Sequence, residues 1–280
     1  MKMVNEIAII TGSRSGIGKT LAKLFLQEGA KVTICSRNEE RVNQTLVELK
    51  DKFGDNVIGV VCDVSDPNAV KNLVDKTIEA FGGIRILVAN AGFNLSYGPF
   101  DCLPLEEANK QANLVIGTNL IGVVNSISAV LPQMIKQGYG RIITSAGGGA
   151  DRPLEHMTIY SASKGGVLAF SKCLALEFKQ KPEDIKLNIF FPGMIYTNLM
   201  RNTCVIEEWK DEDEFREEID LMMKYVATDV VESCQKVIPY VLTSCKSNGK
   251  AFRGFSLFKL IRGFRKVNKE TKKLAPSKKT

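Results

Sequence analysis

Tyr160 and Lys164 are the residues of this sequence whose types and spacing most directly allow proton transfer. Apolar residues recur at helical spacing over 162–178, and residues four apart lie on one face of a helix. An ammonium group one helical turn from a phenol favours the phenolate, so we expect Lys164 to lower the pKa of Tyr160. Such a tyrosine could donate or accept a proton near neutral pH, which predicts acid–base catalysis.

A glycine-rich turn near the N-terminus could hold the diphosphate of a dinucleotide. A strand is predicted over 6–11 and a helix over 19–29, and Gly12, Gly16 and Gly18 stand between them. Glycines let the backbone turn tightly and approach phosphate groups, whose charge a helix N-terminus favours. A plain strand-to-helix turn is the alternative, but a position between the first strand and the first helix is the one that dinucleotide binding requires.

The end of the second predicted strand, 31–35, bears on which dinucleotide is bound. The strand is followed by Ser36 and Arg37, and no acidic residue occurs before Glu39. A carboxylate here suits the ribose hydroxyls of NAD, whereas an arginine suits the 2′-phosphate of NADP. Arg14, in the glycine turn, could reach the same phosphate. We therefore predict NADP as the cofactor, although either arginine could simply face solvent.

The remaining pattern predicts the fold class. A helix over 41–53, a strand over 57–62, a helix over 67–81 and a strand over 84–88 follow one another. This alternation predicts a single α/β domain of the Rossmann-like, doubly wound type, with about seven parallel strands and helices on both faces. Ligands bind such folds at the carboxyl ends of the strands, where Asp63 and Asn90 stand; both residue types are also ordinary turn formers.

Length and composition limit the class of protein. The 280 residues suffice for one large domain. The seven cysteines form no Cys-x-x-Cys pair, so we expect no disulfide framework and no metal site, and a reducing, cytoplasmic location. We also expect a soluble chain, without a cleavable signal and without an uncharged apolar run of membrane-spanning length.

Several motifs in order identify the chain as similar to the short-chain dehydrogenase/reductase family. They are the glycine turn at 11–18, Asp63, Asn90 to Gly92, Asn119, the pair Tyr160 and Lys164, and Pro192-Gly193 with Thr197. The resemblance covers roughly the first 245 residues. It predicts a domain over 1–247 and an extension over 248–280.

The resemblance implies a role for each matching residue. Tyr160 would be the general acid and base, and Lys164 would lower its pKa and bind the nicotinamide ribose. Asn119 would bind a water that links Lys164 to solvent. Asp63 and Val64 would contact the adenine, and Ile195 and Thr197 the nicotinamide carboxamide. The full predicted cofactor set is Gly12, Ser13, Arg14, Ser15, Gly16, Ile17, Gly18, Ser36, Arg37, Asp63, Val64, Asn90, Ala91, Gly92, Tyr160, Lys164, Pro192, Gly193, Ile195 and Thr197.

One family residue, the serine that hydrogen-bonds the substrate carbonyl, is not where the resemblance places it. Counting thirteen residues back from Tyr160 reaches Gly147, and the nearest upstream hydroxyl is Ser145, fifteen residues back. Either the loop is longer and Ser145 takes the role, or the role is vacant. We assign Ser145 as the fourth catalytic residue, beside Asn119, Tyr160 and Lys164.

Residues 198–225 are predicted to be a helical lid over the substrate. Nine acidic residues between 207 and 220 alternate with apolar ones, which is typical of a helix with one solvated face. Lids vary with the substrate, so this segment should set specificity, unless it is a solvated helix that touches no ligand. His156, the single histidine, is expected in an exposed loop.

The C-terminal segment carries all of the excess positive charge. Residues 246–280 hold 12 Lys and Arg and one acidic residue, a net charge of +11, so the other 245 residues, with 26 basic and 30 acidic ones, sum to −4. Leu257, Leu260, Ile261, Phe264 and Val267 recur at helical spacing among basic residues. This basic amphipathic helix could dock on its own domain, or contact a membrane surface or a partner through residues 252–273; we do not expect nucleic-acid binding.

The sequence thus predicts an NADP(H)-dependent oxidoreductase that interconverts a ketone or aldehyde and an alcohol, and that forms homodimers or homotetramers as its family does. The substrate is open, with lipid-like, steroid and acyl compounds among the candidates. The alternative is a nucleotide-binding protein of the same fold with weak or no catalysis, recruited to a membrane surface by its basic tail.

Overall fold

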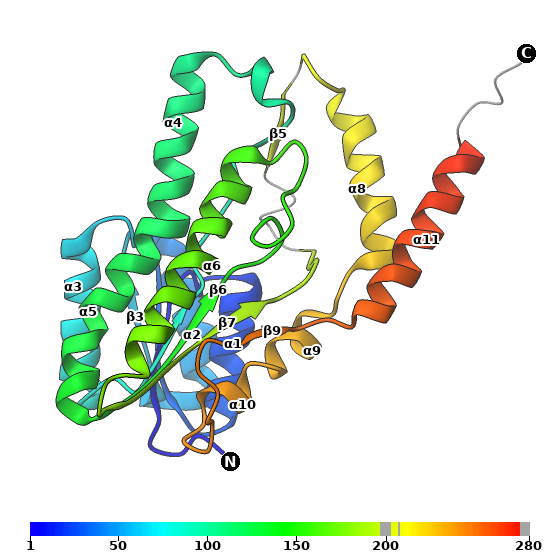
Figure 1. The fold of residues 1–280 in the computed structure, drawn as a ribbon. Helices are drawn as coiled ribbons and strands as arrows, with labels where there is room; N and C mark the ends of the chain where they lie inside the picture. The colour runs from blue at the N-terminus through cyan, green and yellow to red at the C-terminus, as the bar shows by residue number, and fades with distance from the viewer. Residues whose placement is uncertain (197–202, 207, 275–280) are drawn as a thin grey trace, which may run out of the picture.

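The computed structural model describes residues 1–196, 203–206 and 208–274 (Figure 1). The strands are β1 (Ile7–Ile10), β2 (Lys31–Ser36), β3 (Val57–Val61), β4 (Ile86–Ala89), β5 (Ser96–Tyr97), β6 (Tyr139–Ser145), β7 (Asp184–Phe191), β8 (Cys204–Val205) and β9 (Ala251–Arg253). The helices are α1 (Gly16–Gln27), α2 (Glu39–Phe53), α3 (Pro67–Phe81), α4 (Leu105–Ile116), α5 (Gly122–Gln137), α6 (Thr158–Phe178), α8 (Glu212–Val226), α9 (Val230–Gln235), α10 (Ile238–Val241) and α11 (Leu257–Leu274).

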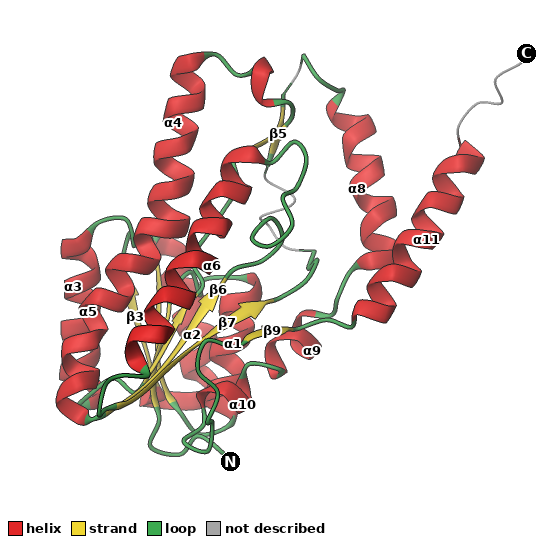
Figure 2. Cartoon of the chain, in the orientation of Figure 1, coloured by secondary structure: helices red, strands yellow, loops and turns green. Residues whose placement is uncertain are grey.

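Seven parallel strands form one twisted sheet in the order β3-β2-β1-β4-β6-β7-β9 (Figure 2). The chain moves outward from β1 to β3, then returns to place β4 on the other side of β1. This reversal opens a crevice at the carboxyl ends of β1 and β4, where ligands bind in folds of this type. The predicted Rossmann-like fold with a central parallel sheet is confirmed, and β5 and β8 form a small second sheet.

Helices bury the two faces of the sheet in separate apolar layers. One layer joins α3, α5 and α6 to the sheet, with Val70, Ile127 and Val167 among its members. The other joins α1, α2, α9 and α10, with Phe25 and Leu49 among its members. Because both faces are covered, the strands are continuous apolar runs rather than alternating ones.

Local signals explain where the helices begin and end. Asn38 and Asp66 each accept a backbone N–H from the first turn of the helix that follows, α2 and α3 respectively. Gly82 and Gly138 end α3 and α5 in the left-handed conformation, at φ of 88° and 70°. Such caps satisfy backbone groups that the helix itself leaves without partners.

The edge of the sheet is completed near the end of the chain by the strand β9. The apolar segment near Pro239 lies in the short helix α10, and the edge strand is β9, which pairs with β7 through Ile189 and Ala251. A proline at the first turn of a helix loses no hydrogen bond, which favours that outcome. The boundary predicted after residue 247 therefore falls before the last strand, and the sheet extends to Arg253.

The prediction that no uncharged apolar run reaches membrane-spanning length was wrong. The continuous helical run Leu105–Gln137, which comprises α4, a π-helical turn and α5, is long and apolar enough to cross a membrane. In the structure α5 packs against α3, β4 and β6, and α4 packs against α6. In the most apolar 18-residue stretch of this run, 44% is buried inside the domain. Packing inside the domain therefore accounts for much of this apolar character.

Helices α8 and α11 lie side by side and project from the sheet (Figure 1). The helix α8 contains most of the acidic run, and α11 is the basic C-terminal helix. Docking of the tail on its own domain, one of the alternatives for this segment, is therefore what the described residues show.

Candidate active site

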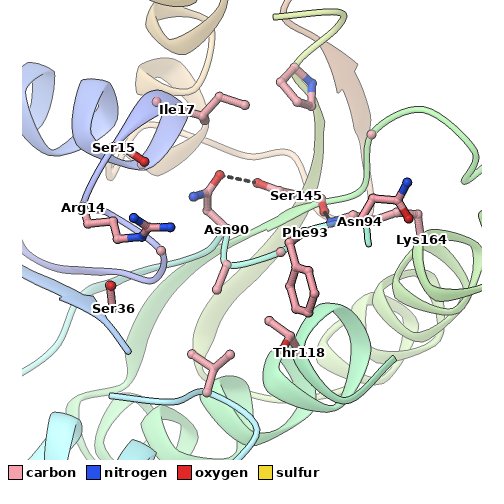
Figure 3. A pocket seen from close by; sticks show the side chains of 18 of the residues that line it. Arg14, Ser15, Ile17, Ser36, Asn90, Phe93, Asn94, Thr118, Ser145 and Lys164 are labelled. Carbon is pink, nitrogen blue, oxygen red and sulfur yellow. Dashed lines mark hydrogen bonds between the residues drawn. The ribbon is translucent and has the colours of Figure 1, made fainter. Parts of the chain in front are cut away.

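A cleft of about 430 Å³ lies at the carboxyl ends of the central strands. In Figure 3, Arg14 and Ser36 stand on one side of it and Lys164 on the other, with Asn90 and Ser145 between them. The cleft is also lined by Ser15, Gly16 and Ile17, at the start of α1. Its length from Arg14 to Lys164 joins the predicted nucleotide end to the predicted catalytic end.

Two glycines of the first turn are required by close backbone contacts. At Gly12 the φ is +66°, and a Cβ would lie 2.8 Å from the Cα of Ala91. At Gly18 a Cβ would lie 2.5 Å from the carbonyl oxygen of Gly12 and 2.9 Å from Nδ2 of Asn90. The turn is therefore pressed against the loop after β4. This cradle, which any side chain would fill, fits the diphosphate of a dinucleotide.

Ser13, also predicted to bind cofactor, has a structural contact instead. Its side chain is fully buried, donates to the carbonyl oxygen of Ile10 at 2.6 Å and accepts from the amide of Cys35 at 2.8 Å. It does not line the cleft. Ser13 thus connects the turn to β2. It can contribute to nucleotide binding only by holding the turn in place.

Three arginines surround the end of β2. Burial lowers the pKa of Arg14, and the charges of Arg41 and Arg37 lower it further, so the three guanidinium groups repel one another. Arg14, Ser36 and Arg37 line the cleft. The hydroxyl of Thr45 holds the carbonyl oxygen of Arg14 at 3.0 Å and so fixes the turn on α2. This positive cluster favours an anionic ligand at the same place.

Asp63 and Val64 differ in where their side chains lie. Val64 lines the cleft, as predicted for an adenine contact. The Asp63 carboxylate accepts from the backbone and hydroxyl of Ser65 at 2.9 and 2.7 Å, and its other oxygen lies 3.9 Å from Arg37. Asp63 does not line the cleft. Its observed contacts are those of the turn former that the sequence offered as the alternative.

The loop after β4 connects the nucleotide end to the catalytic end. Asn90 and Ala91 each donate their amide to the Thr11 hydroxyl at 3.0 Å, which anchors the loop on β1. A Cβ at Gly92 would lie 3.0 Å from Oδ1 of Asn119 and 3.2 Å from Nζ of Lys164. Gly92 therefore leaves the room in which these two side chains approach each other.

Asn119 lies on the π-helical turn Gly117–Ile121 and is fully buried. Its amide oxygen accepts from the backbone of Phe93 at 2.9 Å, and its amide nitrogen donates to the Phe93 carbonyl at 2.9 Å and to the Ser163 hydroxyl at 3.0 Å. The side chain thus locks the loop after β4 onto α6. A π-helical turn frees backbone groups and is frequent at functional sites.

Tyr160 and Lys164 lie on α6 as predicted, and both line the cleft while being largely buried. The Lys164 ammonium donates to the Ser145 carbonyl oxygen at 2.9 Å and lies 5.8 Å from the centroid of the Tyr160 ring. Burial lowers the pKa of Lys164 to about 8. Burial, with a smaller contribution from Tyr97, raises the pKa of Tyr160 well above its ordinary value.

In the cofactor-free protein the pKa of Tyr160 is therefore shifted in the direction opposite to the one expected from Lys164. Removing the phenol from water disfavours the phenolate, and the same burial lowers the pKa of Lys164. The phenol stays protonated at neutral pH, which is the state that a general acid needs.

Ser145 and Gly147 lie at the end of β6 and both line the cleft. The Ser145 hydroxyl lies 3.5 Å from Oδ1 of Asn90, toward the middle of the cleft (Figure 3). A Cβ at Gly147, in contrast, would lie 3.5 Å from the Tyr160 hydroxyl, and the φ of +96° at Gly147 favours glycine. The place beside the phenol is thus occupied by a residue without a side chain.

The predicted segment after β7 is only partly at the cleft. Pro192 lines it, and its carbonyl oxygen accepts from Ser233 at 2.7 Å. Gly193 has a φ of +90° and faces Phe255, and Ile195 is buried; neither lines the cleft. Thr197 lies outside the described residues.

Seven cleft residues are not among those predicted from the motifs: Cys62, Phe93, Asn94, Leu95, Thr118, Ala146 and Gly147. Four of them directly follow or precede a predicted site residue, so proximity to strand ends was the available signal. Phe93 is the most informative, because its ring lies 5.2 Å from the Arg37 guanidinium and extends the nucleotide end of the cleft.

An apolar cluster covers the other side of Tyr160. Tyr97, Met157, Phe215, Ile219 and Met223 are buried together with it. The last three belong to α8, so the acidic helix buries an apolar face in the same cluster as Tyr160 and leaves its acidic residues exposed. His156, expected to be exposed, is half-buried with its ring 4.4 Å from that of Trp209.

Comparisons with known proteins agree with this arrangement. The family described as short chain dehydrogenase matches residues 6–209. A 3-oxoacyl-(acyl-carrier-protein) reductase of Chlamydia muridarum is 36% identical over 199 residues, which are 71% of this chain and 77% of the relative. The dehydrogenase/reductase SDR family member 4 of Sus scrofa is 32% identical over 194 residues, 69% of this chain and 67% of the relative.

Solved structures show the same likeness over more of the chain. Levodione reductase superposes with a TM-score of 0.77 at 25% identity, covering 90% of this chain and 96% of that one. A 3-ketoacyl-(acyl-carrier-protein) reductase from Brucella melitensis, complexed with NADH, superposes with a TM-score of 0.76 at 25% identity, covering 90% and 97%. The family match ends before α8 and α11. The chain belongs to the short-chain dehydrogenase/reductase family and has the oxidoreductase fold of that family.

Proposed function

We propose that the protein reduces an apolar ketone or aldehyde with NADPH, with Tyr160 as the proton donor. The observation that carries this proposal is one continuous cleft in which a buried, protonated tyrosine with its lysine lies at one end and an arginine cluster at the other. The reverse oxidation needs a phenolate, which burial disfavours in the cofactor-free site. Reduction is therefore the favoured direction near neutral pH.

The preference for NADPH rests on charge at the end of β2. A 2′-phosphate would relieve the repulsion that Arg37 and Arg41 exert on Arg14, and no carboxylate at Ser36 competes for the ribose hydroxyls. The ion pair between Arg37 and Asp63 is long and half-exposed, so it holds Arg37 only weakly. Both arginines can therefore turn to an incoming phosphate.

The residues of this chain divide the catalytic work. The bound cofactor supplies the hydride. Tyr160 would give its phenolic proton to the carbonyl oxygen, and Lys164 would bind the nicotinamide ribose and return a proton to Tyr160, being reprotonated from solvent in turn. Asn119 holds the loop after β4 and α6 together, which keeps the Lys164 side chain beside the cleft. The apolar cluster around Tyr160 excludes water from the reacting atoms.

The character of the substrate follows from the same cluster. The α8 side chains that share a buried cluster with Tyr160 are apolar, and Met194, Met222 and Trp209 pack against that cluster. A polar substrate would lose hydration without gaining partners there, whereas an acyl or other lipid-like chain gains burial. Methionines also adapt to irregular shapes, which suits a flexible apolar substrate.

A second function has a specific observation in its favour, namely the missing serine at position 147. Without a hydroxyl donor beside Tyr160, the developing charge on the carbonyl oxygen lacks about 2 to 4 kcal/mol of stabilisation. The Ser145 hydroxyl, assigned to this role from the sequence, lies nearer to Asn90. A nucleotide-binding protein with weak turnover is thus the rival proposal.

One kinetic series separates the two functions. We expect NADPH oxidation with medium-chain and long-chain ketones to be at least tenfold faster than NADH oxidation, and to fall by at least a hundredfold in Tyr160→Phe. Arg14→Ala with Arg37→Ala should raise KM for NADPH and leave KM for NADH nearly unchanged. Turnover that survives Tyr160→Phe would refute the mechanism.

Variants of the β6 end test the rival directly. If the protein is an ordinary reductase, Ser145→Ala reduces turnover, and Gly147→Ser does not increase it. If Ser145→Ala leaves the rate intact while Gly147→Ser raises it, the serine role is vacant in the natural chain. No turnover in any variant, with NADPH still bound, supports the nucleotide-binding protein.

We also propose a homo-oligomer that uses the outer surface of α4 and α5. Leu114, Ile121 and Ile135 are exposed apolar residues that their spacing places on one side of this helical run. Exposed apolar patches of this kind are typical of protein interfaces. Light scattering during size-exclusion chromatography measures the assembly, and a monomer at micromolar concentration would refute it.

A further inference from the structure

We infer that α11 binds the surface of an anionic phospholipid bilayer. Four large apolar residues of this helix are exposed in the folded chain: Leu257 (48%), Phe258 (76%), Ile261 (52%) and Phe264 (40%). At 100° per residue they fall within about 120° of the helix circumference and form one apolar face, which we call the outer face. Such a face costs free energy in water unless something covers it.

The domain itself covers a different side of α11. Leu260 and Val267 are half-buried and Gly263 is buried, and α11 packs against α8. A Cβ at Gly263 would collide with the carbonyl group of Tyr225, so the two helices approach as closely as glycine allows. Lys266 lies over the Tyr225 ring at 5.6 Å, and Lys259 lies 3.5 Å from Glu232. Docking thus fixes α11 and leaves its outer face to solvent.

The positive charge around the outer face indicates which kind of surface binds there. Arg262, Arg265 and Lys269 are exposed; Arg262 and Lys269 lie beside the outer face, and Arg265 falls within its arc, next to Phe264 in the sequence. A second copy of α11 would bring equal positive charge to the same place and would be repelled. An anionic bilayer satisfies both features, because phenylalanine and leucine enter its interface while arginine and lysine bind the lipid phosphates.

Membrane binding through α11 brings the bilayer close to the candidate active site. Its partner helix α8 carries Phe215, Ile219 and Met223, which are buried in one apolar cluster with Tyr160. A bilayer under α11 therefore lies beside the helix that contributes to this cluster. This consequence rests on the proposed reductase function and on its apolar substrate, whereas membrane binding itself does not.

Vesicle sedimentation of the full chain tests the inference. Vesicles of phosphatidylcholine with about one third phosphatidylserine should bind the protein, and pure phosphatidylcholine should bind it at least tenfold more weakly. Phe258→Ser with Ile261→Ser should weaken binding at least a hundredfold, because two large apolar side chains no longer enter the interface. Arg262→Gln with Arg265→Gln should weaken it about 25-fold, at roughly fivefold per charge.

Matched controls keep the result specific to α11. Val47→Ser removes a comparably exposed apolar residue from α2, and Lys76→Gln with Lys181→Gln removes two exposed charges elsewhere. Both should bind as the natural chain does. Thermal unfolding of every variant shows whether it is folded. All substituted α11 side chains are exposed, so we expect unchanged midpoints.

Three results would overturn the inference. The first is an absence of binding to either vesicle. The second is equal binding of the Phe258 and Ile261 variant and the natural chain. The third is loss of an oligomer in that variant without any vesicle binding, which would assign the outer face to a second copy. None of these results depends on enzymatic activity, so they are distinguishable from failure of the proposed function.

Discussion

Replacing Lys164 with methionine should stabilise the cofactor-free protein at neutral pH, although it removes a residue that we place at the catalytic centre. Lys164 is buried, and burial lowers its pKa from 10.5 to about 8. Because the pKa of Lys164 is lower in the folded state than in the unfolded state, its positive charge destabilises the folded state. The cost is fully present below pH 8 and disappears as the pH rises toward 10.5.

The size of the effect follows from the two pKa values. A charged lysine costs the folded state about 3 kcal/mol at pH 7 and about 1.4 kcal/mol at pH 9.5, at 1.36 kcal/mol for each pKa unit. Methionine removes this cost but also the hydrogen bond to the Ser145 carbonyl, which contributes roughly 1 kcal/mol. The variant should therefore be about 2 kcal/mol more stable at pH 7, and nearly equal to the natural chain at pH 9.5.

Urea unfolding of both proteins at the two pH values measures this difference. The hydrogen-bond contribution is the same at both, so the change of about 2 kcal/mol between them isolates the charge. Lys172→Met, at an exposed position of α6, is the control and should show no such change. A stability difference that is equal at pH 7 and pH 9.5 would refute the reasoning.

Two further substitutions test the fold around the site. Gly12→Ala should abolish measurable binding of NADPH and cost roughly 1 to 3 kcal/mol of stability, since its Cβ would lie 2.8 Å from Ala91 and its φ is positive. Cofactor titration measures the affinity and urea unfolding measures the stability. An unaltered affinity would contradict the role of this glycine turn in binding the diphosphate. Arg141→Met should cost roughly 2 to 4 kcal/mol, because the guanidinium is fully buried and donates to the side chain and backbone of Asp184 at 2.7 and 2.6 Å. Lys186→Met, which removes a more exposed partner of the same carboxylate, should cost less than about 1 kcal/mol, and equal losses would show that burial of Arg141 does not matter.

Sequence patterns could predict the fold because they are local and repeated. Apolar strands followed by amphipathic helices leave few arrangements other than a parallel sheet covered on both faces, and the seven strands observed agree with that. The last strand could not be predicted with the same security. Short apolar runs suit a strand or a buried helix equally, and only pairing with β7 distinguishes residues 251–253 from the helix α10.

The site shows the same division more sharply. The spacing of Tyr160 and Lys164 and the order of the glycines are properties of a helix turn and a tight loop, so the sequence alone determined them. The pKa of Tyr160 depends on what covers the phenol, and the covering residues come from α8 and the segment around Tyr97, far away in sequence. A pattern of neighbours along the chain cannot reveal that desolvation outweighs a nearby charge.

At the end of β6 and in the C-terminal helix, only the tertiary structure shows where the side chains point. Counting residues left Ser145 and Gly147 as alternatives, whereas the backbone places Gly147 beside the Tyr160 hydroxyl and Ser145 near Asn90. Periodicity likewise showed that α11 is amphipathic, but only its contact with Tyr225 shows which side is covered. The sequence determined which residues carry charge, apolar surface or a hydroxyl; burial and direction, which long-range packing sets, decided what each of them faces.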